Sequence, residues 1–123
     1  MPQATARVFS TRDAAWREMG GATGYQFKAV VTDDPDYTRA YRCELIRVTP
    51  GGHSRPHKEA VNHALIFIKG RGEIVINGQK WPIADGSVAM VKAGELHCLT
   101  NDGLEDLIMF VIYDPPPRFD AGA

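Results

Sequence analysis

The sequence predicts a single all-β domain built as an antiparallel sandwich, jelly roll or barrel. From Gly24 onward, short runs rich in Val, Ile, Tyr and Phe alternate with Gly, Pro, Asp and Asn. Turn residues at such short, regular intervals are typical of sheets with many short strands. Asn77-Gly78 lies between two of these runs and predicts a type I′ hairpin, because both residues tolerate positive φ.

One short helix is expected before the sheet. Ser10 with Asp13 three residues later resembles a capping box, residues 13–19 favour a helix, and Gly20-Gly21 supplies a left-handed stop. A mobile N-terminal arm is the alternative interpretation of this segment. The strands expected after it cover residues 25–31, 40–48, 63–68, 73–76, 79–83, 87–91, 97–100 and 106–113.

Residues 58–69 admit two interpretations. A helix would place Glu59 and His63 on one face, four positions apart. We favour a strand, because Ile66-Phe67-Ile68 leads into a Gly-bounded turn and then into the hairpin. The expected organisation is an N-terminal arm with the short helix (1–24), a barrel (25–114) and a Pro-rich C-terminal tail (115–123), whose prolines cannot join a ladder.

Composition excludes several classes of function. At 123 residues the chain is too short for a cofactor domain and a separate substrate domain. Fourteen Lys and Arg against fifteen Asp and Glu give a net charge of −1, so neither nucleic acid nor a membrane is expected as a partner. The charged N-terminal segment lacks a signal-peptide core, and we expect a cytoplasmic protein. The two cysteines, Cys43 and Cys98, are expected to be reduced, packed thiols.

Potential metal ligands are concentrated between His57 and His63. Side chains of an extended strand alternate faces, so the odd-numbered His57, Glu59 and His63 would project the same way. With His97 from another strand, they would form a nitrogen and oxygen site for a first-row divalent metal. The alternative is that Glu59 and His63 form only a surface pair or a hydrogen-bonded couple.

Glycine spacing around these ligands resembles a known pair of motifs. The two blocks, Gly51-x5-His57-x-Glu59-x3-His63-x6-Gly70 and Gly86-x5-Lys92-x-Gly94-x2-His97-x3-Asn101, are separated by a short gap. They resemble the paired signatures of the cupin superfamily, G-x5-H-x-H-x3,4-E-x6-G and G-x5-P-x-G-x2-H-x3-N, as found in small single-domain cupins. Glu59 stands where the family usually has His, His63 where it has Glu, and Lys92 where it has Pro.

The resemblance implies a double-stranded β-helix, or jelly-roll cupin barrel, with one divalent transition metal inside. His57, Glu59, His63 and His97 would be its ligands. The order His57, Glu59 and His97 also resembles the facial triad of non-haem iron oxygenases, which makes Fe²⁺ the favoured metal, with Mn²⁺, Ni²⁺, Zn²⁺ or Cu²⁺ as alternatives. Use of 2-oxoglutarate is disfavoured, because no basic residue follows His97 within the barrel.

Three functions remain open at this point. The first is a dioxygenase acting on a small enol, diketone or phenol. The second is a redox-neutral isomerase, lyase or cyclase acting on a small carbonyl or sugar-like compound, with Glu59 as the catalytic proton carrier if it is not bound to the metal. The third is a non-catalytic cupin that binds a ligand for sensing or storage.

A small-molecule substrate is expected in an apolar pocket beside the metal. Phe67 shares the parity of the ligands on its strand and is a candidate to line that pocket. Further substrate-binding candidates near the mouth are Tyr41, Arg47, Lys92 and Glu95. The segment 107–112 is apolar on both faces, which leads us to expect a homodimer.

Overall fold

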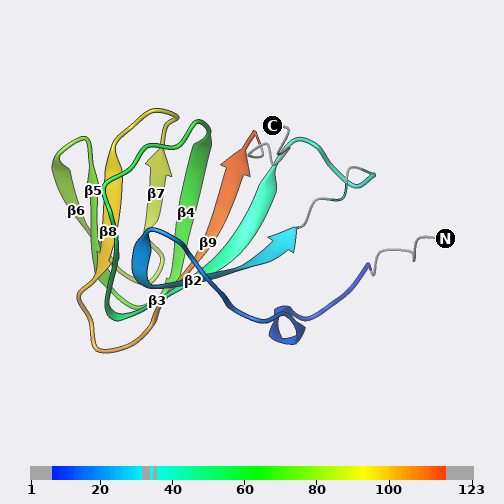
Figure 1. Ribbon diagram of the computed structural model, residues 1–123, viewed down its shortest axis with the longest axis horizontal. Coiled ribbons are helices and arrows are strands. Elements are labelled where there is room, and N and C mark those ends of the chain that lie inside the picture. Colours follow the sequence, from blue (N-terminus) through cyan, green and yellow to red (C-terminus); the bar gives the residue numbers. More distant parts are fainter. Residues whose placement is uncertain (1–6, 32–33, 35, 116–123) are drawn as a thin grey trace.

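The structure is a computed structural model that describes residues 7–31, 34 and 36–115 (Figure 1). Its elements, in chain order, are the 3₁₀ turn η1 (Thr11–Asp13) and the strands β1 (Arg17–Glu18), β2 (Ala22–Val31), β3 (Arg42–Ser54), β4 (Asn62–Lys69), β5 (Gly72–Ile76), β6 (Gln79–Ile83), β7 (Val88–Val91), β8 (His97–Asn101) and β9 (Leu107–Asp114). The all-β prediction is confirmed. The strands expected from the sequence agree with these bounds closely, except that β3 continues to Ser54.

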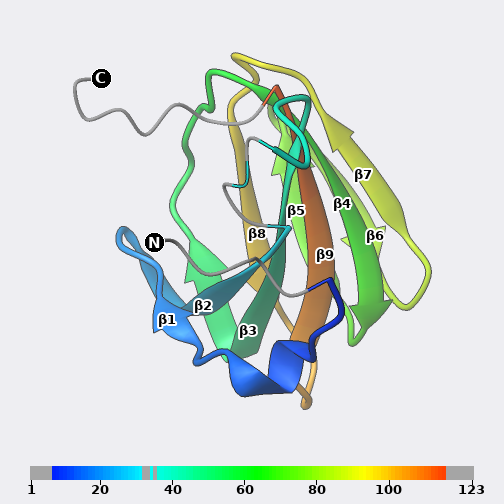
Figure 2. The same cartoon turned by 90° about the vertical axis from the view of Figure 1, so that its right-hand side faces the viewer.

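All strand pairs are antiparallel and belong to one curled sheet. The strand order is β6-β5-β8-β3-β9-β4-β7, while β2 pairs with β3 and β1 pairs with β2. Strands β6, β5 and β8 face β7, β4 and β9 across the interior, and β3 takes part in both layers (Figures 1 and 2). The nearly closed barrel implied by the motif resemblance is therefore confirmed.

The hairpin between β5 and β6 has the predicted turn chemistry. Asn77 and Gly78 have φ values of 49° and 82°, as a type I′ turn requires. This conformation brings Ile76 directly opposite Gln79, so the short turn sets the register of the whole hairpin.

The short N-terminal helix was predicted too long. Ser10 does act as a cap, with its hydroxyl accepting a hydrogen bond from the Arg12 backbone N–H at 3.1 Å, but the turn ends at Asp13. The chain then becomes extended, and the backbone N–H of Met19 donates to the carbonyl of Tyr25 at 2.9 Å. Pairing of β1 with β2 therefore replaces the helix, and Gly20-Gly21 forms the turn of a hairpin.

Residues that were uncertain from the sequence are settled in part. The helical alternative for 58–69 is wrong, because β4 pairs with both β7 and β9. Residues 1–6 of the predicted arm (1–24) lie outside the described residues. So do residues 116–123 of the predicted Pro-rich tail (115–123). Within the described part of the chain, no helix has the length and apolar character needed to cross a membrane.

Strand β9 holds the middle of the larger layer together. It pairs with β3 on one side and β4 on the other, and its residues Leu107, Met109 and Val111 point inward and are buried. Its alternate residues are half-buried on the outer face, which explains why this segment is apolar throughout. The core comprises Tyr25, Ile46, Val48, Leu65, Phe67, Ile74, Ile83, Ala89, Val91, Leu99, Leu107, Met109 and Val111.

Asn101, the last residue of the second motif, closes one end of the barrel. It is fully buried, and its amide donates to the carbonyls of Val48 and Glu105, both at 2.8 Å. The side-chain oxygen Oδ1 of Asn101 accepts a hydrogen bond from the backbone N–H of Gly103 at 2.9 Å. A single side chain therefore ties β8 to β3 and to the loop that leads into β9.

We expect Asn101→Ala to lower the free energy of unfolding by about 3 kcal/mol, because two carbonyls and one N–H lose their partner. Urea denaturation monitored by circular dichroism measures the change. Thr100→Ala is the matched control, since Thr100 is its exposed neighbour on the same strand. Equal effects of the two substitutions would show that the Asn101 network is not a major contributor to stability.

Candidate metal centre

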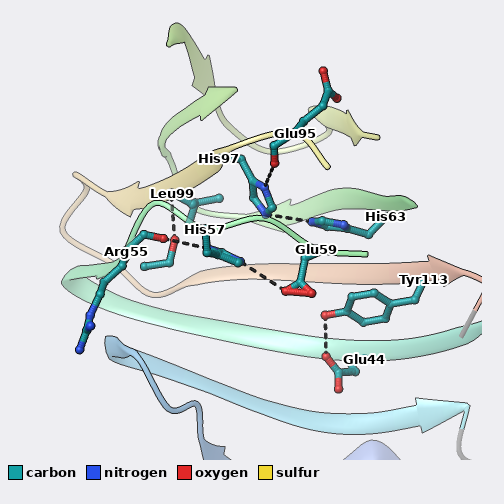
Figure 3. Close-up of polar contacts among 10 residues, drawn as sticks. Glu44, Arg55, His57, Glu59, His63, Glu95, His97, Leu99 and Tyr113 are labelled. Carbon is teal, nitrogen blue, oxygen red and sulfur yellow. Dashed lines mark hydrogen bonds and ion pairs between the residues drawn. The ribbon is translucent and has the colours of Figure 1, made fainter. Parts of the chain in front are cut away.

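Four side chains expected to bind a metal come together at one end of the barrel (Figure 3). His63 lies on β4 and His97 is the first residue of β8. His57 and Glu59 lie between the end of β3 at Ser54 and the start of β4 at Asn62. The parity argument from the sequence therefore does not apply to them, because they are not part of a continuous strand with His63.

A backbone bridge takes the place of that strand. The N–H of His57 donates to the carbonyl of His97, and the N–H of His97 donates to the carbonyl of His57, both at 3.0 Å. The bridge brings the two imidazole rings to a centroid separation of 4.3 Å. Nε2 of His57 in turn lies 3.5 Å from a carboxylate oxygen of Glu59.

The buried half of the site consists of His63 and His97. Their exposed fractions are 6% and 5%, and their Nε2 atoms are 3.1 Å apart. The other half is open to solvent, because the side chains of His57 and Glu59 are 42% and 38% exposed. The site thus has a rigid floor on two strands and an accessible rim on a loop.

Local hydrogen bonds select which ring nitrogen is available. Nδ1 of His57 donates to the carbonyl of Arg55 at 2.8 Å, and Nδ1 of His97 donates to that of Glu95 at 2.9 Å. Because a carbonyl only accepts, Nδ1 of each ring carries a proton, and it is Nε2 that is directed toward the cluster. This arrangement is the one that orients histidines as metal ligands.

His63 differs in its outer partner. Its Nδ1 is buried and makes no hydrogen bond of ordinary geometry. The backbone of Val61 is the polar group beside this ring that tends to raise its pKa, against the larger lowering effect of burial. Without a metal, the contact between the two Nε2 atoms needs one proton, which His63 supplies because His97 carries its own on Nδ1. A ligating His63 would instead carry its proton on Nδ1, toward Val61.

The donor set fits a divalent transition metal in its chemistry and spacing. Two nitrogens at about 2.1 Å from one ion are about 3 Å apart when they occupy neighbouring positions, close to the observed 3.1 Å. In the part of the chain that the structure describes, however, no group of three or more His, Cys, Asp or Glu side chains is placed to hold an ion as it stands. Rotation of the exposed His57 and Glu59 side chains is therefore required to complete a coordination sphere.

Burial keeps the two inner histidines neutral. Desolvation and the neighbouring His97 lower the pKa of His63 to about 4. Desolvation likewise lowers the pKa of His97, against the opposing effect of its bond to the Glu95 carbonyl. Neutral imidazole is the form that ligates a metal, so the environment prepares both rings for this role.

A polar group that the sequence analysis missed lies beside the histidines. Tyr113 of β9 is the direct cross-strand partner of both His63 and Arg42. Its hydroxyl donates to the buried carboxylate of Glu44 at 3.0 Å, and Arg42 lies 3.5 Å from the other oxygen of that carboxylate. The signal available in the sequence was the even-numbered parity of Arg42 and Glu44, which they share with the buried Ile46.

Two predicted substrate-binding residues lie elsewhere. Arg47 was wrongly expected near the site, because its side chain bonds Gln26 at 2.7 Å and stacks on Trp16 at 4.5 Å, on the outer face of the sheet. Phe67 has the predicted inward direction but is fully buried in the core, opposite Met109 and below the level of His63. It shapes the base of the barrel.

The other candidates are near the rim. Tyr41 precedes β3 and bonds the hydroxyl of Tyr37 at 3.2 Å. Glu95 accepts the backbone N–H of Lys92 at 2.7 Å, so it organises the turn before β8. Lys92 and Glu95 line a groove of about 630 Å³ between β6 and β7, which none of the four ligand candidates lines.

The family match agrees with this arrangement. The model of the family described as "Cupin domain" matches residues 44–113, more than half of the chain. The chain belongs to the cupin family. Among curated proteins, none is similar enough in sequence to match this cupin.

Solved structures support the same fold. A predicted oxalate decarboxylase from Thermotoga maritima is 21% identical, with a TM-score of 0.79, and the match covers 88% of this chain and 98% of that one. The polyketide cyclase RemF from Streptomyces resistomycificus is 17% identical, with a TM-score of 0.79 and coverages of 89% and 80%. KdgF from Halomonas sp. is 18% identical, with a TM-score of 0.75 and coverages of 97% and 100%. At these identities the similarity establishes the fold alone.

We expect the stability of the metal-free cupin to fall as the pH is lowered from about 6.5 to about 4. In this window His63 is protonated in the unfolded chain but stays neutral in the folded protein, because folding lowers the pKa of His63. The free energy of unfolding should decrease by about 2 kcal/mol. Urea denaturation across this range tests the slope, which should be smaller in His63→Gln and unchanged in His53→Gln, an exposed control.

Proposed function

We propose that this cupin is a metal-dependent enzyme that acts on a small, oxygen-rich carbonyl or sugar-like substrate without net oxidation. His57, Glu59, His63 and His97 would hold one divalent transition metal. The observation that carries the proposal is the group of polar side chains beside the histidines, which consists of Glu44, Glu59 and Tyr113. Proton-carrying groups next to a metal centre favour isomerase, lyase or cyclase chemistry over oxygenation.

The division of the site suits this chemistry. A divalent ion, when bound, supplies a Lewis acid that polarises a substrate carbonyl. His63 and His97 fix the floor through their strands, and the exposed side lets a substrate enter beside His57. The Glu59 carboxylate, near His57 and partly solvated, is placed to accept a proton from the substrate carbon next to that carbonyl.

Oxygenation by iron is the second candidate. It is favoured by the donor set itself, since His57, Glu59 and His97 supply two imidazoles and one carboxylate. The substrate would then be an electron-rich enol, diketone or phenol. A dioxygenase was the first choice from the sequence, and the buried Glu44–Tyr113 pair is what reverses the order.

The expected homodimer and cytoplasmic location stay predictions. The half-buried outer residues of β9 are continuous with exposed apolar side chains on β4 and β7, among them Ile68, Val88 and Met90. This outer face is a reasonable surface for a second copy of the chain.

Metal binding is expected to depend on Glu59 far more than on Glu95. We expect Glu59→Ala to weaken the affinity for Zn²⁺ by tenfold or more, because a charged donor is lost, while Glu95→Ala changes it less than threefold. Isothermal titration calorimetry of the metal-free cupin measures both affinities. His97→Ala should reduce binding further, and His53→Ala provides a histidine control. Equal effects of the two glutamate substitutions would place Glu59 outside the coordination sphere.

Proton transfer can be observed directly. Protein loaded with Mn²⁺ or Zn²⁺ is incubated in D₂O, without O₂, with dihydroxyacetone and hydroxypyruvate, and proton NMR follows the loss of the signal from the carbon next to the carbonyl. We expect exchange at a rate that falls at least about a hundredfold in Glu59→Gln. Glu95→Gln is the matched control. O₂ consumption by the iron-loaded protein with a diketone or catechol, in the absence of such exchange, would favour the dioxygenase instead.

A further inference from the structure

Charged and polar groups occupy the barrel interior next to His63. Glu44 is 7% exposed, and the side chains of Arg42 and Glu44 are both largely buried. Burial of a carboxylate and a guanidinium is costly even when they are paired. In the row that contains Glu44, its cross-strand partner Val111 and the next residue across, Leu65, both belong to the core, so apolar residues fit this interior well.

The register places Arg42 and Tyr113 at the level of His63, with Glu44 in the next row. Arg42, Tyr113 and His63 are neighbours on three adjacent strands, and the rings of His63 and Tyr113 have a centroid separation of 5.7 Å. Glu59 acts electrostatically on both Glu44 and Tyr113. Figure 3 shows the Glu59 carboxylate and the Tyr113 hydroxyl directed toward one another on the same side of the histidines.

The hydrogen-bond directions make this surface rich in acceptors. The Tyr113 hydroxyl gives its only proton to Glu44, so its oxygen lone pairs face the interior as acceptors. The Glu44 carboxylate has further lone pairs, and Glu59 adds a second carboxylate. Arg42 is the cation of this group, and it already faces Glu44. A ligand that enters here therefore meets hydrogen-bond acceptors.

We propose that Glu44 and Tyr113 form a second subsite, which binds hydroxyl groups at the end of the substrate remote from the metal. A substrate hydroxyl donates to Glu44 or to the Tyr113 oxygen, whereas a second carboxylate is repelled. The substrate class is then a polyhydroxylated acid or carbonyl compound rather than a dicarboxylate. This inference rests on the proposed function, because the metal holds the other end of the substrate.

Electrostatics explains why the subsite discriminates. A carboxylate of the ligand has no proton to donate, so in this partly desolvated interior it would place its lone pairs against those of Glu44 and Tyr113. A hydroxyl carries no charge and satisfies the acceptors by donating its proton. Specificity then arises both from the favourable contact with a hydroxyl and from the penalty against a carboxylate.

Three acids of four carbons test the inference, because they share an α-hydroxycarboxylate head that can chelate a metal. They differ only in the remote part: 2-hydroxybutyrate is apolar there, threonate carries hydroxyls and malate carries a carboxylate. Calorimetry with the Zn²⁺-loaded cupin gives the affinity for each acid at about pH 8, where the carboxyls of the three acids are ionised. We expect threonate to bind about tenfold more tightly than 2-hydroxybutyrate, as one or two added hydrogen bonds provide, and malate to bind more weakly than either.

Isosteric variants assign the effect to the two residues. In Tyr113→Phe, the ratio of threonate to 2-hydroxybutyrate affinities should fall from about tenfold to near unity, because the buried hydroxyl is lost. Glu44→Gln replaces one acceptor oxygen with an amide donor, and it should raise malate affinity several-fold relative to threonate. Tyr37→Phe is the matched control, since its hydroxyl is exposed and bonds only Tyr41 among the described contacts. Thermal melts establish that each variant is folded.

The outcomes separate the two proposals. If Zn²⁺ binds and the three acids bind equally, or malate binds best, the subsite is overturned while the metal centre stands. If Zn²⁺ binds but the preference for threonate survives both substitutions, the subsite is assigned to the wrong residues and the inference fails. If Zn²⁺ does not bind at all, the proposed function fails, and the subsite fails with it.

Discussion

Two backbone hydrogen bonds of 3.0 Å join His57 to His97 and attach the loop after β3 to the first residue of β8. The N–H of Gly94 also donates to the carbonyl of Glu59 at 2.8 Å, and the bridge itself fixes His57 relative to the barrel. With it, the His57 ring packs 4.3 Å from that of His97, which in turn contacts His63 across the interior. The bridge thus converts ligands that are separated by forty residues of sequence into one cluster, and the remaining geometry of the site depends on it.

Strand β9 provides the second constraint. Its pairing with β3 and β4 sets one register for the larger layer, and that register places Tyr113 between Arg42 and His63. The same register stacks the apolar side chains of Met109 and Val111 beneath this row. A buried polar row is tolerated at one end because the rows below it supply the apolar contacts that stabilise the barrel. The apolar rows therefore stabilise the fold, while the row at the end of the same strands supplies the polar side chains of the site.

The strands and the four ligand candidates could be predicted from the sequence, because turn residues, strand alternation and motif spacing are local signals. Features that depend on contacts between distant segments could not. Residues 13–19 have the composition of a helix, but pairing with β2 prevails for Arg17 and Glu18. Arg47 has the parity of the outer face, and the cation–π contact with Trp16 could not be read from spacing. Glu44 and Tyr113 lie in no ligand motif, and only the sheet register brings them to His63.

The exchange of Glu and His between the two positions of the first motif has a physical rationale in this barrel. Position 63 is buried on a strand, where a neutral imidazole is less costly than a carboxylate. Position 59 lies on a loop and is partly exposed, so a carboxylate there keeps much of its hydration. The exchange moves the charged donor from a buried strand position to a partly exposed side chain on a loop. Under the proposed function, a partly solvated carboxylate on this loop would carry a proton more readily than one buried on β4. The arrangement of the ligands, more than their identity, is therefore what would suit this barrel to the proposed proton transfer.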